Sequence, residues 1–280
     1  MKADLHTHTA ASDGQYTPSE LAGLAKKRGI EVLAVTDHDT IAGVDQAMEA
    51  GRAVGLRVIR GVELSAKENH GFHILGYGFS ADAPALTQLC QKLREGRQNR
   101  KYQIMDFLKE KGADISLAEV EELAGGAAVA RPHFARVLTR RGYAADNEDA
   151  FRRYLDSQEF RQKVVRFKAE ARVCVEAIKE GGGVVSLAHP YQMGLPEDEL
   201  EALVKRMKGW GLDAIECFYP KYTAAQQGFY LGLAEKYGLR VTGGSDFHGE
   251  LVKPDVRLAC LDLDLSWLPE GADEPAELGG

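Results

Sequence analysis

The apolar and polar positions of the first eighty residues alternate between short apolar runs and amphipathic stretches. Thr17 to Glu20 supplies an N-cap residue, a proline at the first helical position and a capping-box glutamate, so we expect a helix from there to about Gly29. A second helix is expected over residues 44–54. The short apolar runs predict strands at residues 2–7, 32–36, 57–64 and 72–77.

The pattern changes from about residue 82 to residue 168, where amphipathic segments follow one another without a convincing strand. The longest of them, about residues 83–111, has apolar residues at helical spacing. We interpret residues 82–168 as a helical insertion that caps the active site. Residues 269–280 are acidic and poor in large apolar side chains, which predicts a loose tail.

Predicted strands and helices alternate again after the insertion, so residues 1–81 and 169–268 are expected to form one domain. About seven strand and helix units favour a parallel sheet, most economically closed into a barrel. The fold class expected is therefore α/β, a (β/α)7-like barrel with an insertion. The later helices are expected at residues 170–180, 197–210 and 224–237, and the later strands at 184–188, 213–218, 240–243 and 257–261.

The composition indicates an ordinary enzyme of the cytoplasm. Lys and Arg number 35 against 42 Asp and Glu, a net charge of −7 that argues against electrostatic capture of long nucleic acid. The four cysteines are widely separated, with no C-x-x-C pair, as in reduced cytosolic proteins. The N-terminus lacks a signal-peptide pattern, and no apolar stretch approaches the ~20 residues that span a membrane. We expect no membrane association and no obligate protein partner.

Six of the eight histidines and three carboxylates lie beside the predicted strands. The x-spaced pairs His6/His8 and Asp246/His248 place both side chains on one side of an extended segment. Because the carboxyl ends of parallel barrel strands meet on one face, most of these groups are expected at one rim, where such barrels build active sites. The set is His6, His8, Asp13, His38, Glu63, His73, His189, Asp246 and His248.

Imidazole and carboxylate donors without a thiolate suit a catalytic Mn, Zn or Fe site better than a closed structural zinc site. Nine donors exceed the needs of one ion, and Glu63 can bridge two, so a dinuclear or trinuclear centre is expected. Such a centre lowers the pKa of bound water and neutralises phosphoryl oxygens, which favours hydrolysis of a phosphate ester. Taken singly, a histidine such as His73 in a mostly apolar strand would more often be a core or surface residue than a ligand, and Asp13 could simply be a turn former.

The metal-donor segments resemble, in order, the motifs of the PHP (polymerase and histidinol phosphatase) family. The resemblance implies a distorted (β/α)7 barrel with three divalent ions, with Mn expected and Zn, Fe or Mg as alternatives. By position it implies three ligand sets: His6, His8, Glu63 and Asp246; Glu63, His73 and His189; and Asp13, His38 and His248. Asp37 and Asp39 are expected to orient imidazoles. The segments are Asp4-Leu-His-Thr-His8, Thr36-Asp-His-Asp39, Gly61-Val-Glu63, the strand of His73, Leu187-Ala-His-Pro190 and Gly244-Ser-Asp-Phe-His248.

The insertion, with Arg97 and Arg100 on its long helix and Ala130-Arg-Pro-His-Phe-Ala135 beginning another, resembles one branch of that family. That branch removes the 3′-phosphate from nucleoside 3′,5′-bisphosphates such as adenosine 3′,5′-bisphosphate, and some members are similar to 5′-to-3′ exonucleases on short oligonucleotides. A second phosphate needs its own anchor, for which we expect Arg131 and His133 near a helix N-terminus. Weaker candidates, since helix charges are usually solvated, are Arg97, Asn99, Arg100, Lys101 and Lys168.

The predicted function is therefore a metal-dependent phosphomonoesterase that releases a 5′-nucleotide and phosphate. The catalytic residues expected are His6, His8, His38, Glu63, Asp246 and His248, with water, His38 or His248 protonating the leaving oxygen. Alternatives are histidinol phosphatase or another small-molecule phosphatase, and an amidohydrolase that cleaves a C–N bond. The latter often bridges its metals with a carbamylated strand lysine, a role that Glu63 takes here. A binding module with a structural metal is disfavoured by the complete ligand set.

Overall fold

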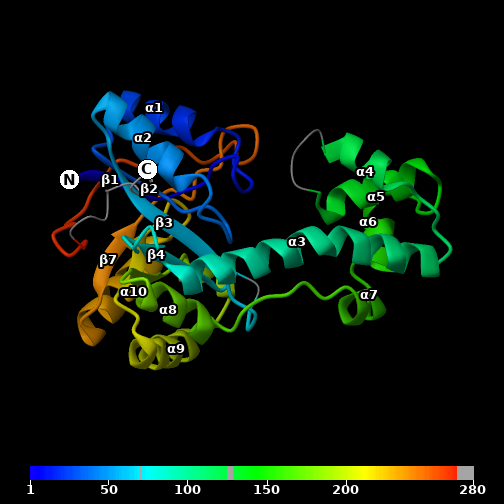
Figure 1. The fold of residues 1–280 in the computed structure, drawn as a ribbon. Helices are drawn as coiled ribbons and strands as arrows, with labels where there is room; N and C mark the ends of the chain where they lie inside the picture. Colours follow the sequence, from blue (N-terminus) through cyan, green and yellow to red (C-terminus); the bar gives the residue numbers. More distant parts are fainter. Residues whose placement is uncertain (70, 125–128, 270–280) are drawn as a thin grey trace. The chain divides into compact units, whose positions relative to one another are not determined.

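The computed structural model describes residues 1–69, 71–124 and 129–269. Its strands form one sheet in the order β7-β6-β5-β4-β3-β2-β1-β8, which curls into a nearly closed barrel (Figure 1). The strands are β1 (Lys2–Thr7), β2 (Val32–Val35), β3 (Arg57–Ser65), β4 (His73–Tyr77), β5 (Val184–Leu187), β6 (Ala214–Phe218), β7 (Arg240–Gly243) and β8 (Leu261–Asp262).

The α/β barrel predicted from the sequence is confirmed, but the expectation that all its strands run parallel is wrong. β4 is antiparallel to both β3 and β5, and β8 is antiparallel to β1. Residues 66–72, between β3 and β4, are too few for a parallel crossover, which needs about a dozen residues or more. The short strand expected at 257–261 lies instead at Leu261–Asp262.

The segment after β7 pairs with the end of β1 and so brings the two ends of the barrel together. The Asp246 N–H donates to the His6 carbonyl at 2.8 Å, and the His8 N–H donates to the Phe247 carbonyl at 2.9 Å. A parallel bridge joins Thr7 and Phe247. These contacts place the His6/His8 segment beside the Asp246/His248 segment.

The outer helices of the barrel follow their sequence signals. The Thr17 side chain caps α1 by accepting from the Glu20 N–H, and the Glu20 carboxylate returns a contact to the Thr17 N–H, as predicted. The apolar faces of the first two helices pack on buried strand residues such as Leu33 and Val58. The helices of this unit are α1 (Pro18–Lys27), α2 (Val44–Val54), α8 (Ala171–Glu180), η2 (Pro190–Met193), α9 (Glu197–Trp210) and α10 (Ala224–Tyr237).

The chain divides into two compact units, Met1–Gln91 with Lys168–Gly280, and Lys92–Phe167. The helix α3 (Pro84–Glu110) begins in the first unit and ends in the second. The second unit has a hydrophobic core of its own, built around Phe107, Phe134 and Phe160. Its other helices are α4 (Leu117–Ala124), α5 (Arg131–Arg140), α6 (Asn147–Ala150), η1 (Phe151–Leu155) and α7 (Gln158–Lys163).

The capping role expected of the helical unit stays a prediction. The loose tail expected at 269–280 lies outside the described residues except for its first position. Among the helices that the structure describes, none combines the length and apolar character needed to cross a membrane.

Candidate metal centre

The nine predicted donors come from segments at one rim of the barrel. His6 lies near the end of β1 and His8 just beyond it, whereas Glu63 lies near the end of β3. His73 is the first residue of β4, yet it reaches the same rim because β4 runs antiparallel and pairs its first residue with Ser65 at the end of β3. A histidine at the start of a strand therefore joins donors at the ends of the others.

A first group of donors consists of His6, His8, Glu63 and Asp246, all buried. The Oε2 atom of Glu63 lies 3.3 Å from His6 Nε2 and 3.2 Å from His8 Nε2. The Oδ1 atom of Asp246 lies 3.3 Å from His8 Nε2 and 3.7 Å from His6 Nε2. These four side chains form the first set that the family resemblance implies.

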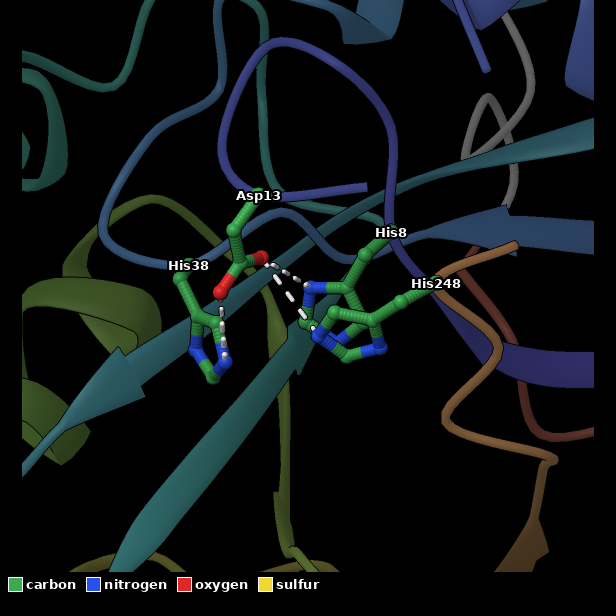
Figure 2. Close-up of side chains that lie close together, drawn as sticks. All are labelled: His8, Asp13, His38 and His248. Carbon is green, nitrogen blue, oxygen red and sulfur yellow. Dashed lines mark ion pairs between the residues drawn. The ribbon is translucent and has the colours of Figure 1, made fainter. Parts of the chain in front are cut away.

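A second group consists of His8, Asp13, His38 and His248, shown in Figure 2. The Asp13 Oδ1 atom lies 3.4 Å from His248 Nε2 and 3.8 Å from His8 Nδ1, and Asp13 Oδ2 lies 3.9 Å from His38 Nε2. A neutral imidazole has only one nitrogen lone pair, so His8 can be a ligand in only one of the two groups. If His8 is a ligand in the first group, then Asp13, His38 and His248 remain, and these are the third ligand set that the family resemblance implies.

A third group brings His38 and His73 to Glu63. His73 Nδ1 lies 2.8 Å from Glu63 Oε1, and His38 Nδ1 lies 2.9 Å from Glu63 Oε2. His189, which the implied second set includes, lies with Nε2 at 2.9 Å from Glu63 Oε1. Both oxygens of Glu63 therefore face imidazoles from several strands, as a carboxylate that bridges metal ions must.

Several atoms of this cluster are buried and have no hydrogen-bond partner among the residues that the structure describes. They are His6 Nε2, both ring nitrogens of His8, His38 Nδ1, Glu63 Oε2 and His189 Nδ1. A buried polar atom without a partner is costly, and a divalent cation among such lone pairs removes that cost. Nitrogen and oxygen donors at these separations therefore fit divalent metal ions.

Burial and neighbouring charges shift the pKa values of several of these side chains in opposite directions. Burial lowers the pKa of His8, but the carboxylates of Asp246 and Glu63 outweigh it and raise the pKa to about 9. Burial lowers the pKa of His73 and of His248 to about 4 each. Burial opposes ionisation of Glu63, but His38 and the other imidazoles around it hold the pKa of this carboxyl well below its usual range. The carboxylates are thus ionised, and a cation meets negative charge.

Backbone strain is concentrated at the same rim. Among the residues that the structure describes, three that are not glycine have positive φ: Asp39 at 56°, His189 at 22° and Asp246 at 57°. Left-handed backbone costs about 1–3 kcal/mol for such residues and persists where the surroundings enforce it. Two of the three are predicted metal ligands, and the third adjoins His38.

Residues 4–171 match the PHP domain. The chain belongs to the PHP family. This result confirms the family inferred from the motifs, and the His, Asp and Glu groups described above supply the donors for the metal dependence expected of this PHP chain.

Three curated relatives align with most of this PHP chain. It is 36% identical to a 5′-3′ exoribonuclease of Haemophilus influenzae, with 88% of this chain and 90% of the relative covered. It is 35% identical to a phosphoribosyl 1,2-cyclic phosphate 1,2-diphosphodiesterase of Eggerthella lenta, with 89% and 95% covered. It is 31% identical to a 3′,5′-nucleoside bisphosphate phosphatase of Chromobacterium violaceum, with 88% and 86% covered. All three names describe phosphoester chemistry, and this PHP chain is a hydrolase of phosphoester bonds.

Two solved structures share the fold. One is an amidohydrolase from Chromobacterium violaceum with bound sulfate and no metal, at TM-score 0.74 and 29% identity over 95% of this chain and 93% of that one. The other is assigned as a metal-dependent phosphoesterase, from Bifidobacterium adolescentis, at TM-score 0.72 and 29% identity over 93% and 92%.

Residues that surround the metal donors, and that were not predicted from the sequence, hold the donors in place. The Asp4 carboxylate accepts from the Ser245 N–H at 2.9 Å and from the Ser245 hydroxyl at 2.6 Å, and burial raises its pKa to about 6. Glu216 contacts His6, and Tyr219 contacts Asp246. For Glu216 the available signal was a carboxylate inside the otherwise apolar strand β6.

The two aspartates expected to orient imidazoles have other described contacts. Asp37 accepts from the Thr9 N–H at 2.8 Å and from the Thr9 and Ser12 hydroxyls at 2.7 and 2.5 Å. Asp39 accepts from the Ser65 N–H at 2.9 Å. Asp37 thereby organises the turn that carries Asp13, rather than an imidazole ring.

The predicted phosphate-binding residues lie mostly in the helical unit. Arg100 Nε is buried without a hydrogen-bond partner among the described residues, and burial together with the charges of Arg131 and Arg97 lowers the pKa of Arg100. Arg131, at the start of α5, also pairs with Asp156 at 3.1 Å. The three arginines form a cationic cluster within this unit.

The remaining predicted phosphate-binding residues have different surroundings. His133 Nδ1 accepts from the Ala130 N–H at 3.0 Å, and Asn99 is exposed. Lys101 pairs with Glu121 at 2.7 Å. Lys168 belongs to the barrel unit, where its ammonium donates to the Ala66 carbonyl at 3.3 Å.

Proposed function

We propose that this PHP chain is a metal-dependent phosphomonoesterase that removes the 3′-phosphate of nucleoside 3′,5′-bisphosphates, with adenosine 3′,5′-bisphosphate yielding AMP and phosphate. The observation that carries the proposal is the buried carboxylate of Glu63 between imidazoles of several strands. We assign the three implied ligand sets to three divalent ions, with Mn the expected metal and Zn, Fe or Mg as alternatives.

Metal ions bound there supply a water of lowered pKa as nucleophile and neutralise phosphoryl oxygens. The residues of the chain supply the geometry. Burial keeps the pKa of His248 at about 4, so its imidazole is neutral near pH 7, as a ligand must be. We therefore assign the proton on the leaving 3′-oxygen to water rather than to His248.

A second activity, 5′-to-3′ exonuclease action on short oligonucleotides, is supported by the exoribonuclease relative from Haemophilus influenzae. The two reactions share their chemistry. In a bisphosphate the phosphorus on the 3′-oxygen is a monoester, whereas in RNA it is a diester, and hydrolysis at that oxygen releases a 5′-nucleotide in both cases. The same metal centre and the same anchor for a 5′-phosphate serve either substrate.

The anchor for the second phosphate is assigned to Arg100 and Arg131 of the helical unit, with His133 and Asn99 as further contacts. Arginine forms paired, charge-assisted hydrogen bonds with phosphate oxygens. The unpartnered Arg100 Nε supports this role. Lys101 is the weakest of the predicted contacts because Glu121 already engages its ammonium.

The test compares phosphate release from adenosine 3′,5′-bisphosphate, adenosine 3′-monophosphate, histidinol phosphate and a phosphoribosyl 1,2-cyclic phosphate, together with AMP release from a 5′-phosphorylated dinucleotide. We expect the bisphosphate to have the highest kcat/KM among the phosphatase substrates. Preference for histidinol phosphate or the cyclic phosphate would overturn the substrate assignment, and C–N hydrolysis without phosphoester hydrolysis would overturn the reaction class.

The anchor has its own test. Arg100→Met should raise KM for the bisphosphate about tenfold or more, since a charge-assisted hydrogen bond contributes about 1.5–3 kcal/mol. Turnover of adenosine 3′-monophosphate, which lacks the 5′-phosphate, should not change. Lys109→Met, at an exposed lysine of the same helix that is not among the proposed contacts, is the matched control and should behave as the unaltered chain does. Equal effects of Arg100→Met on both nucleotides would contradict the anchor.

A further inference from the structure

Glu216 is a buried carboxylate that belongs to none of the three donor groups. It lies in the middle of β6, between Ile215 and Cys217, with no exposed surface. Its Oε1 atom lies 3.0 Å from His6 Nδ1, and its Oε2 atom accepts a hydrogen bond from the His189 backbone N–H at 2.7 Å. Each oxygen therefore contacts a different predicted metal ligand.

The contact with His6 decides which of its ring nitrogens faces the metal donors. An ionised carboxylate only accepts hydrogen bonds, so His6 Nδ1 must carry the proton. The lone pair is then on Nε2, which points to Glu63 Oε2 at 3.3 Å and to Asp246 Oδ1 at 3.7 Å. A carboxylate on the far nitrogen fixes the tautomer and the ring orientation of a ligating histidine and raises its basicity.

The contact with His189 fixes a strained segment. His189 has φ of 22°, and its Nε2 atom lies 2.9 Å from Glu63 Oε1. The hydrogen bond to Glu216 holds the backbone that aims this ring. Tyr222, in turn, donates its hydroxyl to the Glu216 carbonyl at 3.1 Å, which fixes the strand that carries the carboxylate.

We propose that Glu216 is a positioning residue that presets His6 as an Nε2 ligand and holds His189 in place, so that one side chain of β6 prepares ligands from β1 and β5. The inference rests on the metal binding that the proposed function requires, and it is independent of which substrate is hydrolysed.

Glutamine in place of Glu216 separates this role from simple packing. Glu216→Gln keeps the size of the side chain but has one acceptor and one donor group where two acceptors are needed. If its oxygen accepts from the His189 N–H, its amide N–H₂ faces His6 Nδ1 and forces the proton onto Nε2. If the amide is turned the other way, its N–H₂ group faces the backbone N–H of His189, so that two donors meet there. Either orientation removes one of the two functions of the carboxylate.

The experiment measures Mn²⁺ binding by calorimetry and the ¹⁵N shifts of the histidine rings by NMR with Zn²⁺, for the full chain and for Glu216→Gln. We expect Mn²⁺ affinity to fall about 10- to 100-fold at the weakened site. The His6 ring signals are assigned by their loss in His6→Asn. In the unaltered chain we expect them to show a protonated Nδ1 and a metal-bound Nε2, and in Glu216→Gln we expect this pattern to change.

Asp213→Asn is the matched control. The Asp213 carboxylate lies just before β6 and accepts from the Val185 N–H on β5 at 2.9 Å, but it contacts none of the donors. Asp213→Asn should bind Mn²⁺ as the unaltered chain does. Unchanged affinity and an unchanged His6 pattern in Glu216→Gln, or equal losses in Asp213→Asn, would overturn the proposal.

If Glu216→Gln does not fold, the role of Glu216 can still be tested on the unaltered chain. With Zn²⁺ bound, His6 must show a protonated Nδ1 and a ligated Nε2, and the reverse pattern would overturn the proposal. Failure of the proposed function is seen separately, as metal binding with an intact His6 pattern but no phosphate release from a bisphosphate.

Discussion

The hydroxyl of Tyr219 donates a hydrogen bond to Asp246 Oδ2 at 2.9 Å, whereas Asp246 Oδ1 faces His8 Nε2 at 3.3 Å. The ammonium of Lys253 contacts the same Oδ2 atom at 2.8 Å. One oxygen of this carboxylate is thus occupied by protein donors and the other is turned toward the metal donors. Asp246 is therefore arranged to bind an ion through Oδ1 alone.

Removing the hydroxyl of Tyr219 tests this division. Tyr219→Phe should lower Mn²⁺ affinity by about tenfold, because partners that orient a ligating carboxylate typically contribute 10- to 100-fold to metal affinity. Calorimetric titration of the metal-free protein measures the change. Tyr237→Phe, which removes a hydroxyl bonded to Glu201 at 2.7 Å on the outer helices, is the control and should leave the affinity unchanged. Equal affinities of Tyr219→Phe and the unaltered chain would contradict the assignment.

Two carboxylates of the cluster should differ in the number of ions they support. Glu63 belongs to two donor groups and Asp13 to one. Glu63→Gln should therefore reduce the bound metal per chain, measured by elemental analysis after dialysis, more than Asp13→Asn does. Phosphate release should fall at least about 100-fold in Glu63→Gln, because metal stabilisation of charge contributes several kcal/mol. A larger metal loss in Asp13→Asn would show that Glu63 is not the bridging ligand.

Metal stabilisation should increase with pH. Burial lowers the pKa of His8, but the carboxylates of Asp246 and Glu63 outweigh burial and raise it from 6.5 to about 9. The folded state then holds this proton more tightly than the unfolded state, so its contribution to stability is complete below pH 6.5 and is lost as pH rises toward 9. Metal ions need the neutral ring and gain affinity over the same interval.

The difference in Tm between Mn²⁺-loaded and chelator-treated protein should therefore grow from about pH 6.5 to about pH 8.5, as scanning calorimetry at a fixed excess of Mn²⁺ would measure. A difference that is constant or shrinks with rising pH would show that proton release from His8 is not linked to metal binding.

The close approach of Gly244 to His6 has a structural consequence. A Cβ atom at Gly244 would lie 2.4 Å from the His6 Cβ and 2.5 Å from the His6 backbone nitrogen. Gly244→Ala should lower the free energy of unfolding by about 1–3 kcal/mol, the usual cost of overpacking, and should weaken metal binding by displacing His6. Urea denaturation and calorimetry measure the two effects.

Gly228→Ala provides the contrast. Gly228 lies in α10, and nothing lies within 4 Å of a Cβ built there. Alanine should raise the free energy of unfolding by about 1 kcal/mol through helix propensity and leave metal binding unchanged. A neutral Gly244→Ala variant would mean that the barrel closes less tightly there than the contacts indicate.

The sequence predicted the parts of the fold and site that depend on local pattern. The capping box at Thr17 and the donors at strand ends could be identified because each is encoded within a few residues. The direction of β4 was missed, although the short segment before it excludes a parallel crossover. Local pattern also could not show that His38 faces Glu63 as well as Asp13, because that depends on ring orientation in three dimensions.

The outer residues were missed for another reason. Glu216 and Tyr219 contact His6 and Asp246, which belong to other segments of the chain, and Lys253 contacts Asp246 seven residues before it. None of these spacings in the sequence indicates the contact. A charged residue in an apolar strand indicates a buried interaction, but the partner is defined only when the strands are paired.

The most direct test of the account is a titration of metal-stripped protein with Mn²⁺, in which bound metal and phosphate release from adenosine 3′,5′-bisphosphate are followed together. We predict no release without metal, and release that rises as the ions bind and saturates when the rim is filled. Full phosphate release from protein shown by elemental analysis to hold no divalent metal would contradict the central claim.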